Sequence, residues 1–163
     1  MQSIYNQEIL DKIKAVYPIE LKNFIGWSNE DIEFLEKQIY PSQLPQAVKD
    51  FLLWAGNKFD NLDFIYYLNN FVVKDFYHPK PEFIRMEIEK NLHLELCDYV
   101  VFFYYIEGDF ISFCKIENNN PNPPVYKTDY ELEDANIFAL CSPSFTQFIA
   151  DLAISELKRK EEM

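Results

Sequence analysis

The stretch LPQAVKDFLLWAG, residues 44–56, gives the clearest structural signal in this chain of 163 residues. Four of its apolar residues recur at i, i+3, i+4 and i+7, the spacing of one helix face: Val48, Phe51, Leu52 and Ala55. Pro45 fits the first turn of a helix, where its missing N–H costs nothing. Gly56 suits the left-handed residue just past a helix end. The stretch therefore predicts an amphipathic helix that packs against a core.

Two further helices are expected toward the N-terminus. An apolar stripe predicts a helix over residues 3–16, formed by Ile9, Ile13 and Val16. Ser28 and Asp31 stand close to a capping-box arrangement, in which the two side chains bond each other's backbone N–H groups. They predict a second helix that runs from there to about Ile39.

Two stretches rich in Val, Phe and Tyr follow later in the chain, at 98–106 and 110–116. The turn Glu107-Gly108-Asp109 between them predicts a β-hairpin. Much of the hairpin is apolar on both faces, which predicts a central place in a sheet covered by helices. Three residues are too few for a crossover between parallel strands, so we expect a mainly antiparallel sheet.

The C-terminal third predicts short strands at 125–127 and 136–140, then a final helix. Ser144 caps that helix, with Gln147 as its capping-box partner. The basic run at 158–160 suits the C-terminal end of the helix dipole.

The chain length leaves room for one core. Residues 61–78 have no clear pattern, and a helix is expected over 79–96. The sequence therefore predicts a single α+β domain over residues 1–163. N-terminal helices and one C-terminal helix are expected to pack on the antiparallel sheet.

Composition excludes several classes of function. The net charge of −12 disfavours direct binding to nucleic acid or to an anionic membrane surface and favours a basic protein partner. Three glycines in the whole chain are too few for a phosphate-cradling loop. The first residues do not resemble a signal peptide, and no apolar run is long enough to span a bilayer, so we expect a cytoplasmic protein.

The acidic residues are unevenly placed, and they supply the candidate binding surface. No Lys or Arg occurs between Lys127 and Lys158. The candidates for contact with a partner are a stretch before the last predicted strand and the hairpin tip: Asp129, Glu131, Glu133, Asp134, Glu107 and Asp109. Loops on a rigid sheet commonly carry recognition residues. The alternative interpretation is a solvated surface that keeps the protein soluble.

No motif predicts catalysis or a cofactor. His93 and Cys97 stand one helical turn apart, but two ligands do not make a metal site. Ser112 and Lys115 match S-x-x-K in a predicted strand, whereas catalytic use places these residues on a helix. Neither the carboxylate pairs, such as Asp60 with Asp63, nor the core-facing Trp54 indicates a reaction. We therefore expect no enzymatic activity, no metal and no cofactor.

The order of the motifs resembles the SUKH superfamily of fungal cell-wall-synthesis regulators and bacterial immunity proteins. The family pattern is an I-x-x-L/F-E helix, an LP-x-x-Y/V-x-x-F-L helix, a sheet and a closing SF-x-x-F helix. The matching segments lie at 32–36, 44–52 and 144–148, with the hairpin between the last two. The resemblance covers about 27–155 and leaves 1–26 as an N-terminal helical extension. Residues 57–97 carry no family signature, and Asn57 stands where the family often has a second glycine.

The resemblance implies a non-enzymatic α+β domain. Its bacterial members bind and neutralise cognate toxin domains, often nucleases, and their binding surfaces vary with the toxin. It therefore predicts an immunity protein for this chain and transfers no binding residue. The alternative is a regulatory scaffold that binds other cellular proteins, as the fungal members do. An enzyme with an unrecognised site is a third possibility, because a fold does not determine a function.

Overall fold

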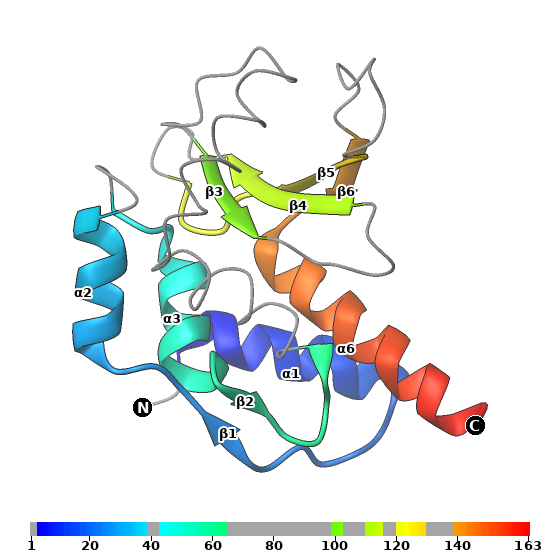
Figure 1. Ribbon diagram of the computed structural model, residues 1–163. Helices are drawn as coiled ribbons and strands as arrows, with labels where there is room; N and C mark the ends of the chain where they lie inside the picture. Colours follow the sequence, from blue (N-terminus) through cyan, green and yellow to red (C-terminus); the bar gives the residue numbers. More distant parts are fainter. Residues whose placement is uncertain (1–2, 39–42, 65–98, 103–109, 116–119, 130–138) are drawn as a thin grey trace.

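A computed structural model describes residues 3–38, 43–64, 99–102, 110–115, 120–129 and 139–163 (Figure 1). Within these ranges the helices are α1 (Ile4–Val16), α2 (Asn29–Gln38), α3 (Gln46–Ala55) and α6 (Phe145–Glu161). The strands are β1 (Phe24–Ile25), β2 (Lys58–Phe59), β3 (Tyr99–Phe102), β4 (Phe110–Lys115), β5 (Val125–Asp129) and β6 (Ala139–Ser142). The predicted α+β class is confirmed. The helix expected at 79–96 falls outside the described residues.

Helix starts follow the predicted caps. The Ser28 hydroxyl accepts the Asp31 N–H at 3.1 Å, and the Asp31 carboxylate accepts the Ser28 N–H at 3.1 Å, which completes a capping box. Ser144 caps α6 by accepting the Gln147 N–H at 3.2 Å. The reciprocal half of that box is absent, because the Gln147 side chain instead bonds Lys12 and Asp151.

Helix α3 corrects two details of the prediction. Pro45 is the N-cap and lies just outside the first turn. Gly56 has φ −61° and ψ −25°, so it is right-handed. A Cβ at Gly56 would lie 2.6 Å from the Leu52 carbonyl oxygen and 2.8 Å from the Trp27 ring. Glycine is therefore required here by lack of space and not by a left-handed backbone.

The strands form two antiparallel sheets. β1 pairs with β2, and the larger sheet has the order β3-β4-β5-β6. The predicted antiparallel pairing of the hairpin strands is confirmed, with Phe102 opposite Ser112, and the turn at 107–109 lies outside the described residues. Of its two strands only β4 is central, since β3 has one described neighbour. β6 extends past the predicted strand to Ser142, which pairs with Val125 of β5, while residues 136–138 of that prediction lie outside the described residues.

Among the residues whose burial is described, the core lies mainly among the helices. Figure 1 shows the larger sheet at one end of the helices, with α6 running away from β6 toward the C-terminus. Ile9 and Ile13 of α1 share one buried cluster with Phe51 of α3 and Ile149 of α6. Of the sheet's described residues, Cys114 and Val125 join that cluster. None of the described helices combines the length and apolarity needed to cross a membrane.

Candidate functional site

The described residues include one of the six predicted binding residues. Asp129 is the last residue of β5. The other five, Glu107, Asp109, Glu131, Glu133 and Asp134, lie outside the described residues. The role of these five residues in binding therefore stays a prediction. The structure does describe the strands that flank their segments.

Strand register brings the two predicted acidic segments to one end of the larger sheet. Phe110, the first residue of β4, is paired with Asp129, the last residue of β5. Since neighbouring strands are antiparallel, the chain also leaves β3 and enters β6 at this end. The connections 103–109 and 130–138 therefore both join the sheet there. Together with Asp129 they contain six acidic residues and no Lys or Arg. We call this end of the larger sheet, together with its two connections, the acidic end.

The opposite end of the sheet is fixed to the helices through the connection between β4 and β5. The Pro121 carbonyl accepts the Ala47 N–H of α3 at 2.8 Å. The Asn122 amide oxygen accepts the Thr146 N–H at 3.1 Å, and its NH₂ group donates to the Thr146 hydroxyl at 2.9 Å. That hydroxyl donates in turn to Glu8 of α1 at 2.9 Å. This end, which we call the anchored end, is committed to internal contacts.

The two described cysteines are poor nucleophiles. Burial strongly raises the pKa of the Cys114 thiol in β4. Partial burial and the nearby Asp151 carboxylate raise the pKa of the Cys141 thiol in β6, and Lys127 partly offsets this. The reactive form of cysteine is the thiolate, so both shifts lower the nucleophilicity of these thiols at neutral pH, although Cys141 is exposed.

The other sequence candidates have structural contacts where they are described. The Asp60 carboxylate accepts hydrogen bonds from the Lys22 N–H and the Asn23 side chain, each at 3.3 Å, and Asp63 lies 3.9 Å from Lys160. Trp54 packs against Phe24 and Phe59, as its predicted core role requires (ring centroids 4.3 and 5.3 Å apart). Ser112 is buried in β4, in the strand where it was predicted.

His93 and Cys97 fall outside the described residues. Among the residues that are described, no three His, Cys, Asp or Glu side chains gather in a way that could hold a metal ion.

One buried carboxylate was not anticipated from the sequence. Glu156 of α6 is 7% exposed, and its two oxygens accept the backbone N–H groups of Asp63 at 2.6 Å and Phe64 at 2.8 Å. Lys160, one turn along, lies 3.3 Å from the same carboxylate and donates to the Asn61 carbonyl. These contacts fix residues 61–64 against α6, so the role of Glu156 is structural.

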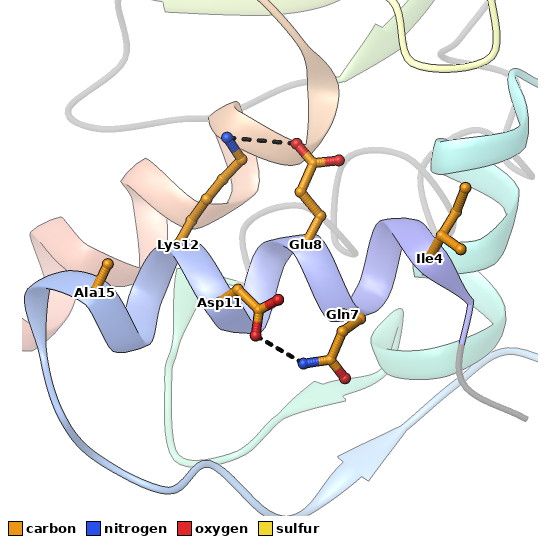
Figure 2. A pocket seen from close by; sticks show the side chains of 6 residues that line it. All are labelled: Ile4, Gln7, Glu8, Asp11, Lys12 and Ala15. Carbon is orange, nitrogen blue, oxygen red and sulfur yellow. Dashed lines mark hydrogen bonds and ion pairs between the residues drawn. The ribbon is translucent and has the colours of Figure 1, made fainter.

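A shallow, open depression of about 510 Å³ runs along the outer face of α1 (Figure 2). Its charged side chains have partners on the same helix. Glu8 lies 3.4 Å from Lys12, and Gln7 donates to Asp11 at 2.8 Å. Its described lining contains no nucleophile: Ile4, Gln7, Glu8, Asp11, Lys12 and Ala15. It does not have the composition of a catalytic site.

Comparison with known proteins gives no assignment, since no protein-family model and no curated protein matches the chain. The resemblance to the SUKH superfamily therefore stays a prediction from the order of the motifs.

Proposed function

We propose that this protein is a cytoplasmic immunity protein that binds a cognate bacterial toxin domain, such as a nuclease, and neutralises it. Binding uses no cofactor and takes place through the acidic end of the larger sheet. One observation carries the proposal: the register of β4 and β5 joins both acidic segments to the same end of one sheet. The two connections that contain five of the six acidic residues therefore join the sheet at the end where β5 finishes with Asp129.

The chemistry of a nuclease supplies the complementary surface. An enzyme that binds nucleic acid presents a basic groove to the phosphate backbone. An acidic protein edge is attracted to the same groove and can exclude the substrate from it. Long-range attraction between opposite charges raises the association rate by roughly 10- to 1,000-fold at low salt. Fast capture of the toxin suits a protein that protects the cell producing it.

The division between the two ends of the sheet supports the same surface. At the anchored end, the polar groups of Asn122 and Thr146 are already used by contacts with the helices. A partner that bound there would have to replace those contacts. At the acidic end the sequence provides charge of one sign and no internal counter-charge within the two connections.

Co-purification tests the proposal. The full chain, carrying an affinity tag, is expressed with the product of the neighbouring gene in its genome. We expect a stable complex with a basic toxin domain, and loss of that domain's toxic activity in the complex. Binding to a cellular protein without toxic activity would instead support the regulatory scaffold. A complex in which the toxin stays fully active would overturn the proposal.

A further inference from the structure

We draw no further inference here: the strongest candidate, the open depression along the outer face of α1 in which Glu8 and Lys12 are paired (Figure 2), carries nothing, because nothing in the described structure shows what covers it.

Discussion

The helical body, formed by α1, α2, α3, α6 and the β1–β2 ribbon, uses its charges differently from the acidic end of the sheet. In the helical body, the carboxylates of Glu156 and Glu36 contact both cations and backbone N–H groups. Glu156 lies beside Lys160, and Glu36 accepts the Leu44 N–H and lies 3.4 Å from Lys49. At the acidic end, six acidic residues occur with no base in the same segments. Charge that is paired within a chain contributes to its folding, whereas unbalanced charge acts on solubility and association.

This contrast predicts that substitutions in the helical body cost stability, and that charge changes at the acidic end alter association and leave the fold intact. Four single substitutions and one triple variant test it, from the largest expected effect to the smallest.

Gly26→Ala should have the largest effect. A Cβ at Gly26 would lie 1.7 Å from the Leu53 carbonyl oxygen, so β1 and α3 would have to separate. The adjoining hydrogen bond from the Trp27 N–H to the Leu52 carbonyl would also be strained. We expect a loss of about 4 kcal/mol or more in the free energy of unfolding, measured by urea denaturation. Gly56→Ala, whose closest contact would be 2.6 Å, should cost less. An equal or smaller loss for Gly26→Ala would contradict this packing.

Glu156→Ala should follow. It removes the acceptor of the Asp63 and Phe64 N–H groups and one of the partners of Lys160. We expect a loss of about 3 kcal/mol in urea denaturation. Glu156→Gln is the matched control, since its amide keeps one oxygen acceptor and should retain part of this stability. If both variants matched the parent protein, the carboxylate would not hold residues 61–64.

Thr146→Val tests the anchored end. Valine has a similar shape but no hydroxyl, so Asn122 loses an acceptor and Glu8 loses a donor. Thr146 is fully buried, and we expect a loss of about 2 kcal/mol in chemical denaturation. Thr146→Ser keeps the hydroxyl and should lose less. A valine variant as stable as the parent protein would contradict the role of the hydroxyl, and a larger loss in serine than in valine would show that packing of the methyl group matters more.

Ser28→Ala removes half of the capping box of α2. We expect a loss of about 1 kcal/mol in the free energy of unfolding, because the Asp31 N–H loses its acceptor. The effect should be visible as a lower Tm in circular dichroism. Ser28→Thr keeps a hydroxyl and should stay close to the parent protein. No change in the alanine variant would mean that the cap does not stabilise the fold.

The helices were predictable because their signals are local. The apolar face of α3 and the Ser28–Asp31 box each lie within a few residues of sequence. The antiparallel hairpin was equally predictable, from a turn too short to cross over. These features depend on side-chain periodicity and turn residues, which can be read within a short segment of sequence.

Contacts between distant segments were not predictable in the same way. Gly26 and Gly56 are explained by the backbone of α3 and the ring of Trp27, which no local pattern indicates. Glu156 bonds Phe64 across 92 residues of sequence. One signal could have identified Glu156, since it continues the buried stripe of Ile149 and Ala153 at helical spacing.

The sequence identified the candidate site by its acidic residues but did not predict how the segments that contain them are arranged. Charge counting selected the two acidic segments separately. Their convergence on one end of the sheet follows from the order β3-β4-β5-β6 and from the pairing of Phe110 with Asp129. A single hairpin could not establish that order. The identity of the partner also depends on the partner's own binding surface, which this sequence does not encode.

The smallest expected effect on stability belongs to the acidic end. In the triple variant Glu131→Lys, Glu133→Lys and Asp134→Lys, we expect an unfolding free energy within about 0.5 kcal/mol of the parent protein. The matched control reverses three exposed charges outside the larger sheet: Glu20→Lys, Glu30→Lys and Glu162→Lys. The ion pairs of Glu20 with Lys22 (2.8 Å) and of Glu162 with Lys158 (4.0 Å) are solvent-exposed, so their loss should cost little stability. Both variants change the net charge by the same amount, so a difference between them reports the position of the charge.

The most direct test of the account is the association rate of these two triple variants with the basic toxin domain, measured by stopped flow at low and at physiological salt. We expect the acidic-end variant to associate about tenfold more slowly at low salt and to depend less on salt, while the control stays much closer to the parent. Equal rates for the acidic-end variant and the parent protein, or an equal reduction in both variants, would contradict the claim that the acidic end is the binding surface.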